Sequence, residues 1–413
     1  MNVVIIGGGA AGMMAAITSA KEGNQVTLLE KTGSLGNKVK ITGKGRCNLT
    51  FEGDIEDFKE NVVKNSKFMY SSFTQFDNHD VMQFFENLQV PLKVERGNRV
   101  FPVSDQAQDI VLALKKELER LHVKVIYSER VTSLEVIDKK ISAVVTQNDH
   151  RYECNKCIIA TGGVSYPTTG STGDGYLIAE QIGHHIVDIQ GGLVPLKSQD
   201  PICKALQGLT LKKIGYRLLD NEKEIYRDFG ELLFAHFGLT GPVVLSSSSI
   251  LNRIDHIESK LKNGKIRASI DLKPALDKET LDKRICRDFE KYSNKEFKNS
   301  LEDLLPQKLI PIVIKLSRIP EHKKVHQITK EERENLVKII KDISVPISGF
   351  MTRDMAVITC GGIDIKEVNP KTMESRMISG VYFAGEVLDV DAYTGGYNLQ
   401  IAFSTAVAAG KNN

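Results

Sequence analysis

The sequence predicts an α/β fold in which one domain, built around a parallel sheet, is interrupted by a long insertion. Three observations lead to this prediction. The chain opens with a short apolar strand, Val3–Ile6, that runs into a glycine-rich turn. The C-terminal segment from Gly380 onward is likewise rich in apolar residues and glycine. Between these ends the pattern changes, first to alternating strands and then to charged helices. We therefore expect both ends of the chain to share one fold.

The length supports more than one domain, because 413 residues exceed what a single core usually holds. We predict a discontinuous domain of residues 1–190 and 346–413, a β-rich insertion of residues 191–273 and a helical insertion of residues 274–345. In the helical part, Thr329 and Glu332 predict a capping box at the start of a charged helix. Further upstream, Ser104 or Asp105 is expected to cap an amphipathic helix, and residues 54–90 read as largely helical.

Composition narrows the class of protein. Hydrophobic residues make up 41% of the chain and charged residues 26%, as in ordinary globular proteins. No apolar run reaches the roughly 18–20 residues that a membrane helix needs. The first apolar run ends in glycines and has no basic leader, so we expect a strand and a cytoplasmic location. The six cysteines are scattered, and Cys154-x-x-Cys157 lacks a second ligand pair, so we expect neither a disulfide framework nor a metal site.

The opening turn carries the first functional motif, Gly7-x-Gly9-x-x-Gly12. It follows a strand, opens a helix and precedes a second strand, Gln25–Glu30. In that context the first glycine permits a tight turn, the second lets a pyrophosphate approach and the third allows close helix packing. Glu30 would accept hydrogen bonds from an adenosine ribose. The motif therefore predicts a dinucleotide site at the N-terminus of the helix.

Two later segments favour FAD over NAD as the resident dinucleotide. The strand CIIATGG, residues 157–163, ends in the Ala-Thr-Gly turn at which flavoproteins return to the dinucleotide. Near the C-terminus, GVYFAGEVLD brings Gly385 and Glu386 to the place where such proteins carry a carboxylate for the ribityl chain. TGGYNLQ then opens the last helix. Its N-terminus would stabilise negative charge on a reduced flavin.

The chain resembles the BaiN/RdsA-type NAD(P)/FAD-dependent oxidoreductases, a group of bacterial flavoproteins, throughout its length. The resemblance lies in LGNKVKITGKGRCNLT, FPVSDQAQDI, SYPTTGSTGDGY, FGELLFAHFGLTGP and GVYFAGEVLDVDAYTGGYNLQIAFSTA. It implies a Rossmann-like FAD-binding domain of the glutathione-reductase-like type, interrupted by a β-rich subdomain and a helical subdomain. It also implies reduction of a carbon–carbon double bond, either in uracil of large-subunit ribosomal RNA, giving dihydrouridine, or in an unsaturated steroid.

These segments together define the expected cofactor site. The predicted cofactor-binding residues are Gly7, Gly9, Ala11, Gly12, Glu30, Lys31, Lys38, Gly43, Arg46, Cys47, Asn48, Val131, Ala160, Thr161, Gly162, Gly385, Glu386, Asp389, Gly396, Tyr397, Asn398 and Leu399. The loop SYPTTGSTGDGY, residues 165–176, follows Ala-Thr-Gly directly and is expected to face the flavin.

Cys47, within TGKGRCNLT, is open to two interpretations. A dithiol shuttle is disfavoured, because the position where such an enzyme carries its second cysteine is Glu52. Cys47 is either a small residue beneath the flavin or the donor of the proton that C=C reduction requires. The candidate catalytic acids are Cys47, Tyr166, His236 and Tyr397, and we hypothesise that Cys47 donates.

Two further sequence features bear on the electron donor and on the substrate. No second G-x-G-x-x-G follows a strand, so NAD(P)H is expected to visit the flavin transiently. From Lys197 to Asp342 there are 29 Lys and Arg against 22 Asp and Glu, which suits an RNA partner. The basic groups there are Lys212-Lys213, Lys323-Lys324 and a helix carrying Lys283, Arg284, Arg287, Lys291, Lys295 and Lys298. A reductase of a small unsaturated molecule and a flavin-bearing binding module without turnover are the alternatives.

Overall fold

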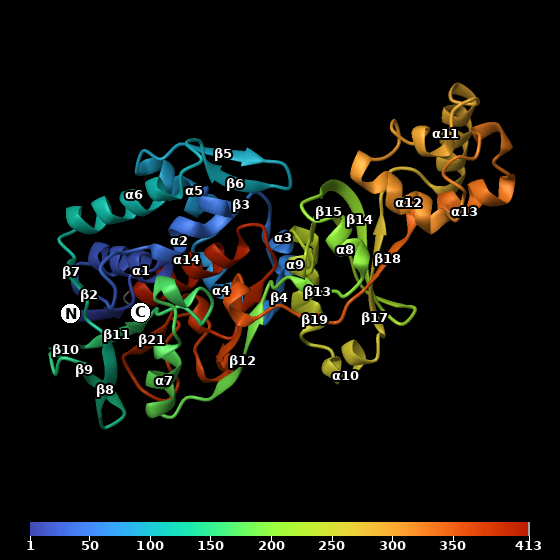
Figure 1. The fold of residues 1–413 in the computed structure, drawn as a ribbon. Coiled ribbons are helices and arrows are strands. Elements are labelled where there is room, and N and C mark those ends of the chain that lie inside the picture. Colours follow the sequence, from blue (N-terminus) through green and yellow to red (C-terminus); the bar gives the residue numbers. More distant parts are fainter. Residues whose placement is uncertain (412–413) are drawn as a thin grey trace. The chain divides into compact units, whose positions relative to one another are not determined.

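The computed structural model describes residues 1–411, except for the side chain of Arg353 (Figure 1). It contains two compact units. Unit 1 comprises residues 1–192 and the segment from Thr352 onward, and unit 2 comprises Leu193–Met351. Each unit has its own cluster of buried apolar side chains. The insertion predicted over residues 191–345 overlaps unit 2, but unit 2 begins at Leu193 and continues to Met351, so residues 346–351 lie outside the domain to which the sequence assigned them. The division of the insertion at residue 274 stays a prediction.

Unit 1 is built on a five-stranded parallel sheet in the order β21-β11-β1-β2-β7. Its strands are β1 Asn2–Ile6, β2 Gln25–Glu30, β7 Lys124–Tyr127, β11 Lys156–Ile159 and β21 Val381–Phe383. Both β1 and β11 are buried along almost their whole length, as parallel strands covered on two faces must be. The strand β21, from the C-terminal segment, continues this sheet beside β11. Both ends of the chain therefore share one fold, as the sequence predicted.

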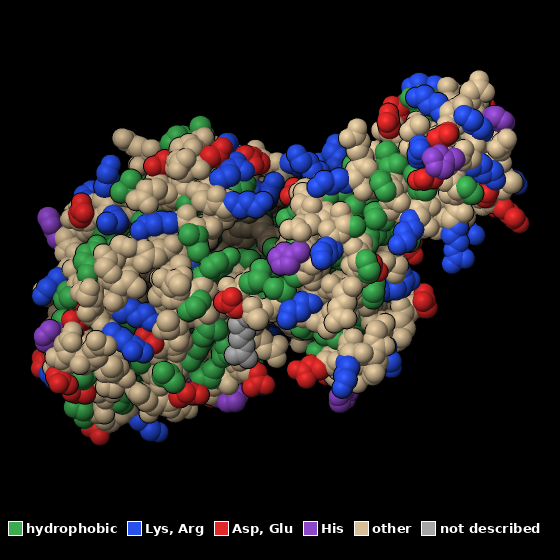
Figure 2. Space-filling model, in the orientation of Figure 1, with side chains coloured by type: hydrophobic (Ala, Val, Ile, Leu, Met, Phe, Trp, Pro, Cys, Tyr) green, Lys and Arg blue, Asp and Glu red, His purple; other side chains and the backbone are tan. Residues whose placement is uncertain are grey.

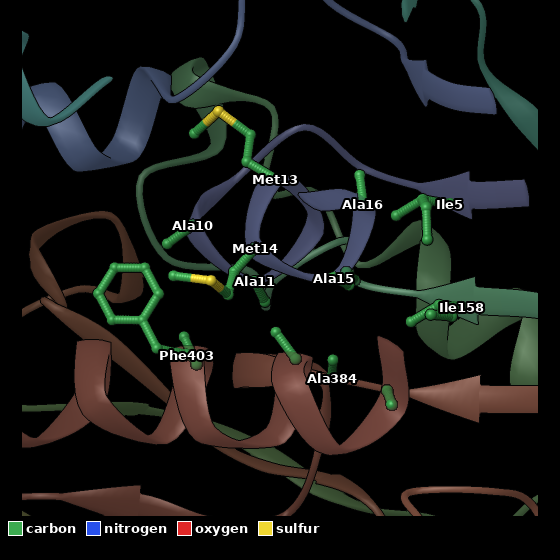
Figure 3. Packing of buried hydrophobic residues seen from close by; sticks show 14 of the residues in the cluster. Ile5, Ala10, Ala11, Met13, Met14, Ala15, Ala16, Ile158, Ala384 and Phe403 are labelled. Atoms are coloured by element: carbon green, nitrogen blue, oxygen red, sulfur yellow. The ribbon is translucent and has the colours of Figure 1, made fainter. Parts of the chain in front are cut away.

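Two helices of small residues cover this sheet, α1 Ala10–Lys21 and α14 Tyr397–Gly410 (Figure 3). The hydroxyl of Ser19, near the end of α1, donates to the carbonyl of Gly410 at the end of α14, at 2.9 Å. At the other end, a Cβ on Gly385 would lie 2.8 Å from Ala11 and 3.7 Å from Ala402. The helices therefore run in the same direction. Their N-termini lie toward the same end of the helix pair.

Residues 50–127 of unit 1 are mainly helical, with short strands between the helices. The elements are β3 Thr50–Phe51, α3 Ile55–Asn61, β4 Val62–Lys64, α4 Ser66–Gln75, α5 Asn78–Asn87, β5 Leu92–Glu95, β6 Arg99–Pro102 and α6 Ala107–Arg120. The predicted cap of α6 is wrong: Gln106 precedes the helix and makes no side-chain cap. Asp105 is instead engaged by Arg46 and Lys93, so tertiary ion pairing takes the carboxylate from the helix end.

The insertion leaves and re-enters unit 1 on paired strands. β12 Ile186–Gly192 and β20 Ile358–Ile363 are antiparallel, with Gly192 opposite Ile358. The remaining elements of unit 1 are α2 Asn37–Ile41, β8 Val131–Ile137, β9 Lys140–Thr146, β10 Arg151–Glu153, α7 Asp174–Gln181 and β22 Asp391–Ala392. Strands β8, β9 and β10 form an antiparallel meander, and β22 pairs with β4.

Unit 2 contains a seven-stranded antiparallel sheet in the order β18-β17-β14-β15-β16-β13-β19. The strands are β13 Leu196–Lys197, β14 Thr210–Asp220, β15 Lys223–Ala235, β16 Gly238–Thr240, β17 Ile266–Asp271, β18 Ile343–Pro346 and β19 Gly349–Phe350. The helices are α8 Pro201–Ala205, α9 Pro242–Leu251, α10 Ile257–Lys262, α11 Lys278–Lys291, α12 Ile310–Ser317 and α13 Lys330–Lys341. The predicted capping box of Thr329 and Glu332 is confirmed at the start of α13.

Sheet and helices of unit 2 share one core. Leu281 of α11 and Leu336 of α13 belong to the same buried cluster as Tyr216 and Ile270 of the sheet. Across residues 1–411, no helix is long and apolar enough to cross a membrane.

Candidate cofactor and active site

The glycine-rich turn between β1 and α1 packs against the Ala-Thr-Gly turn that follows β11. Gly7 has φ +101°, and a Cβ there would lie 2.6 Å from the carbonyl oxygen of Ala160. A Cβ on Gly12 would lie 1.8 Å from the carbonyl oxygen of Gly7. Neither position admits a side chain unless the backbone moves. The fold itself therefore requires both glycines.

Gly9 has a different environment. Its φ of −80° is open to any residue, and no atom lies within 4 Å of the place where its Cβ would be. It precedes α1 without a side-chain cap, and the first turn of the helix contains no acidic residue. Partially positive N–H groups of the helix therefore border open space, which is the arrangement that receives a phosphate at a helix end.

The carboxylate of Glu30 lies at the end of β2, beside the same turn. Its oxygens accept from the N–H groups of Gly8 and Thr32, each at 2.7 Å. The next residue, Lys31, pairs with Asp174 at 2.9 Å, and Arg130 pairs with the other oxygen of Asp174 at 2.9 Å. Burial would raise the pKa of Asp174, but Arg130 and Lys31 outweigh it and lower that pKa. Val131, the buried first residue of β8, follows Arg130 directly.

Lys38 of α2 forms an ion pair with Glu386, which belongs to the predicted Gly385-Glu386 segment near the C-terminus. Its ammonium lies 2.6 Å from the Glu386 carboxylate and donates to the Ser165 hydroxyl at 2.5 Å. The N–H of Thr359 donates to the same carboxylate at 2.7 Å. Burial alone would raise the pKa of Glu386, whereas the charge and hydrogen bonds of Lys38, with the donors from Thr359 and Ser165, lower it below its ordinary value. Glu386 is therefore held as a carboxylate.

The loop containing Gly43 and Cys47 leads to Asn48 and Thr50, which contact the N-terminus of α14. Gly396, with φ +99°, precedes this helix, and a Cβ there would lie 2.3 Å from the carbonyl oxygen of Thr50. With its amide oriented to satisfy both neighbours, Asn48 accepts from the N–H of Gly396 at 3.1 Å and donates to Thr50. The loop and the last helix thus form one unit of structure, although the sequence separates them widely.

Other predicted residues around this helix end have structural partners. The ring of Tyr397 lies 4.7 Å from that of Phe51, measured between centroids. The side chain of Asn398 bonds to both backbone groups of Ala392. Leu399 is partly buried against the core of unit 1.

The side chains of Cys47 and Arg46 lie in different environments, the first in the apolar core and the second in a cluster of ion pairs. The Cys47 side chain is fully buried, with φ +61°, and burial raises the pKa of its thiol to about 12. Arg46 instead pairs with Glu95 and Asp105 and lies over the ring of Phe101, 4.2 Å from its centroid. Its positive charge is therefore already matched by two carboxylates of unit 1.

The candidate acids are divided between the two units. Tyr166 lies in unit 1 with φ +52°, directly after Ser165, which donates to Glu386 at 3.1 Å. Tyr397 is also in unit 1, where burial and Asp57 raise the pKa of its hydroxyl to about 12. His236 belongs to unit 2, in the exposed turn between β15 and β16, with its ring against Phe237.

Two buried polar atoms in unit 1 test whether FAD suits this site. Thr161 Oγ1 and Asp389 Oδ1 are both buried, and neither has a hydrogen-bond partner within residues 1–411. The other oxygen of Asp389 pairs with Lys64 at 2.8 Å. Both residues belong to the set expected to bind the cofactor. Orphaned buried acceptors of this kind call for a polar ligand. Together with the open space at Gly9, they fit the hydroxyl and phosphate groups of FAD.

Several polar residues of this site were not in the predicted set. Ser165, Thr359, Arg130 and Lys64 each bond to a predicted residue or its partner. Ser165 had a signal, since its loop was expected to face the flavin. Thr359 and Lys64 had none, because β20 and β4 reach the site only through tertiary pairing. Within the described part of the chain, no group of three or more metal-ligating side chains is placed to hold a metal ion.

Comparison with known proteins now identifies the family. The profile of the HI0933-like protein Rossmann domain matches residues 1–412. The chain belongs to the HI0933-like family. A 3-dehydro-bile acid delta(4,6)-reductase of Clostridium scindens is 32% identical, over 99% of this chain and 98% of its own length. A ribosomal RNA dihydrouridine synthase of Haemophilus influenzae is also 32% identical, over 98% of this chain and 96% of its own length.

Solved structures support the fold. The chain superposes on 3-ketosteroid delta1-dehydrogenase from Sterolibacterium denitrificans with a TM-score of 0.52 and 11% identity, covering 99% of this chain and 98% of that one. Membership of the HI0933-like family and this fold confirm the predicted Rossmann-like FAD-binding architecture. The chain is a flavoprotein oxidoreductase with FAD as its cofactor.

Proposed function

We propose that this protein uses NAD(P)H to reduce an activated carbon–carbon double bond, and that its substrate is uracil in large-subunit ribosomal RNA. The observation that carries the redox part is the parallel pair of uncapped helix N-termini, α1 and α14, in one unit. The full-length relative named ribosomal RNA dihydrouridine synthase supports the substrate. A ribosomal RNA substrate agrees with the cytoplasmic location expected from the sequence.

Each group of unit 1 has a part in holding the cofactor. The N-terminus of α1, with its open space at Gly9, would bind the pyrophosphate. The Glu386 carboxylate, kept ionised beside Lys38, would accept hydrogen bonds from ribityl hydroxyls. The N-terminus of α14 would stabilise negative charge at the pyrimidine edge of the flavin. When bound, FAD supplies the hydride.

The reaction also needs a proton at the carbon next to the one that accepts the hydride. The sequence suggested Cys47 as the donor, but its complete burial and the pKa of about 12 of its thiol favour a packing role, so we do not retain it as the first candidate. Tyr166 gains support from its position, since it follows Ser165 in the Glu386 network and holds a left-handed backbone conformation uncommon for a bulky residue. Its hydroxyl is the first alternative donor.

The decisive test uses FAD-loaded protein under anaerobic conditions with NADH or NADPH and a transcript of large-subunit ribosomal RNA. We expect the visible flavin band to bleach with the nicotinamide and to return when RNA is added. Mass spectrometry should then show one uridine heavier by two hydrogens. Protein stripped of FAD is the control. A flavin that neither nicotinamide reduces would exclude them as donors.

A small unsaturated molecule is the second candidate substrate. It is favoured by the bile acid reductase, which matches this chain at the same 32% identity and likewise over almost the whole of both chains. Adding a 3-oxo-Δ4 steroid in place of RNA distinguishes the two. Reoxidation of the flavin by the steroid, and not by RNA, would reject the RNA proposal. A flavin that stays oxidised with chemical reductants such as dithionite would indicate a binding module without turnover.

A further inference from the structure

The sequence suggests three groups of basic residues in unit 2 as binding sites for a polyanion. In the structure these groups differ in how many of their residues are paired with carboxylates. On α11, Arg284 and Arg287 contact Asp288, and Lys291 pairs with Asp303 at 2.8 Å. Near this helix, Lys298 pairs with Glu296, and Lys323 pairs with Glu332. Figure 2 shows the same mixture, with red acidic side chains among the blue basic ones around α11–α13. Of the basic residues in these two groups, Arg284, Arg287, Lys291, Lys298 and Lys323 therefore contact a carboxylate, whereas Lys283, Lys295 and Lys324 form no ion pair within residues 1–411.

Lys212 and Lys213 of β14 differ from these residues. Adjacent residues of a strand normally point to opposite faces, which would bury one of the two. Here the register between β14 and β15 shifts between Leu211 and Ile214, so the strand is irregular at the lysine pair. Both lysines are exposed, while Leu211 and Ile214 on either side of them are buried. Such a bulge changes the direction in which side chains leave the strand. Here it leaves the ammonium groups of both lysines accessible to solvent.

These lysines border a pocket of about 130 Å³ that lies wholly within unit 2. Its lining is apolar apart from three lysines: Lys212, Lys213 and Lys273, with Leu211, Ile214, Leu272, Leu304, Leu305, Pro306 and Leu309. A single water needs only about 10–15 Å³, so the space admits a group of several heavy atoms. Among residues 1–411, no carboxylate lies within ion-pair distance of any of these three ammonium groups.

Lys273, two residues after the end of β17, supplies the third charge. The nearby carboxylates are already paired, Asp271 with Lys341 at 2.6 Å and Asp288 with Arg284 at 2.7 Å. Burial, together with the charge of Arg284, lowers the pKa of Lys273 below its ordinary value. A cation without a partner in such a place is stabilised by an incoming anion.

We propose that this pocket binds an RNA strand, with Lys212, Lys213 and Lys273 on its phosphates and one unstacked base against the leucine-lined floor. The inference rests on the proposed RNA substrate and assigns where unit 2 holds it. A pocket lined by apolar side chains and by three lysines without carboxylate partners in the described chain matches a nucleotide, whose base is flat and weakly polar and whose phosphate is an anion. Single-stranded RNA is recognised by this combination of phosphate contacts and exposed bases.

The test measures binding of a fluorescein-labelled oligouridine to the FAD-loaded protein by anisotropy over a range of salt concentrations. We expect Lys212→Glu/Lys213→Glu to weaken binding about tenfold at physiological salt and to reduce the slope of log affinity against log salt by about 1–1.5. The charge-conserving pair Lys212→Arg/Lys213→Arg should bind like the unaltered protein. Circular dichroism and thermal unfolding of each preparation report that unit 2 of the variant is folded.

Lys262→Glu/Lys265→Glu provides the matched control. Both lysines are exposed residues of unit 2 at the far end of β17 from the pocket, and the charge change is identical. An equal loss in this control would mean general charge attraction and would overturn the pocket, as would unchanged binding in the Lys212/Lys213 variant. Competition by polyglutamate as strong as by oligouridine would assign the pocket to an acidic polypeptide. If the unaltered protein binds no RNA, the proposed substrate fails as well.

Discussion

The two units present polar groups in opposite ways. In unit 1, Lys38 and Glu386 are 348 residues apart in sequence, yet they meet at 2.6 Å, and Thr359 and Ser165 complete the network. In unit 2, the three lysines of the pocket have no carboxylate partner among the described residues. Unit 1 therefore fixes its site through backbone and buried contacts, whereas the pocket of unit 2 leaves its three lysines without a counter-charge from residues 1–411. A rigid cofactor suits the first arrangement, and a flexible polyanion suits the second.

The largest difference between the two units is expected when a glycine is substituted in each of them. Gly12→Val places a side chain where even a Cβ would lie 1.8 Å from the carbonyl of Gly7. We expect it to lower the free energy of unfolding by at least about 3 kcal/mol and to abolish the bound FAD. Thermal unfolding and flavin absorbance measure both effects.

Gly208→Ala in unit 2 is the control, and Gly12→Ala, which also adds only a Cβ, is measured beside it. Gly208 has φ +82° but no atom within 4 Å of its Cβ position, so only backbone strain of about 1 kcal/mol is expected. Comparable losses in the two variants would contradict the idea that unit 1 depends on close backbone contacts.

Lys38→Met tests the buried network of unit 1. It leaves the Glu386 carboxylate without its cation, so we expect the free energy of unfolding of FAD-free protein to fall by about 2 kcal/mol at neutral pH. Because the folded protein lowers the pKa of Glu386, this contribution is fully present above the ordinary value of 4.5 and is lost as the pH falls below it. Urea unfolding should show that the variant and the unaltered protein converge below pH 4.5.

Lys38→Met/Glu386→Gln is the control for this variant. Replacing both partners removes the uncompensated charge and should restore part of the stability. A double variant as unstable as the sum of the single changes would mean that the two side chains do not interact.

Gly9→Ala separates cofactor binding from folding. The structure has room for this methyl group, so the melting temperature of FAD-free protein should not change. A pyrophosphate at the N-terminus of α1 would meet it, and the affinity for FAD should fall about tenfold or more. Titration of stripped protein with FAD measures the effect. Unchanged affinity would move the pyrophosphate away from this turn.

Cys47→Ala is expected to have the smallest effect. Because the thiol is buried, the variant should lose about 1 kcal/mol of stability and retain turnover per bound FAD. Tyr166→Phe, assayed alongside, should slow turnover without loss of FAD. Lost turnover in Cys47→Ala at full FAD content would instead establish the thiol as the proton donor.

The sequence predicted what depends on local patterns. The strand, turn and helix around Gly7–Gly12 followed from glycine spacing and apolar runs, and the capping box of Thr329 followed from a motif of four residues. Strand β4 was missed because three residues between two helices carry little periodicity, and its partner β22 lies more than three hundred residues away. The Arg46 cluster and the Lys38–Glu386 pair likewise depend on long-range contacts.

The bulge in β14 was partly predictable from the sequence and partly dependent on long-range contacts. Two lysines between Leu211 and Ile214 break the alternation of a strand, so the irregularity could have been inferred from the sequence. Which of the three basic groups stays unpaired could not, because this depends on where Asp288, Asp303 and Glu332 fall in space.

The pairing of β12 with β20 makes the whole of unit 2 equivalent to one very long hairpin loop. Gly192 and Ile358 face each other across this ladder, so the backbone closes at the same point whatever lies between them. Loop entropy grows only slowly with length, and such a junction tolerates exchange of its contents. The flavin domain can thus keep its sheet and its helix pair unchanged while the sequence and length of the inserted unit vary.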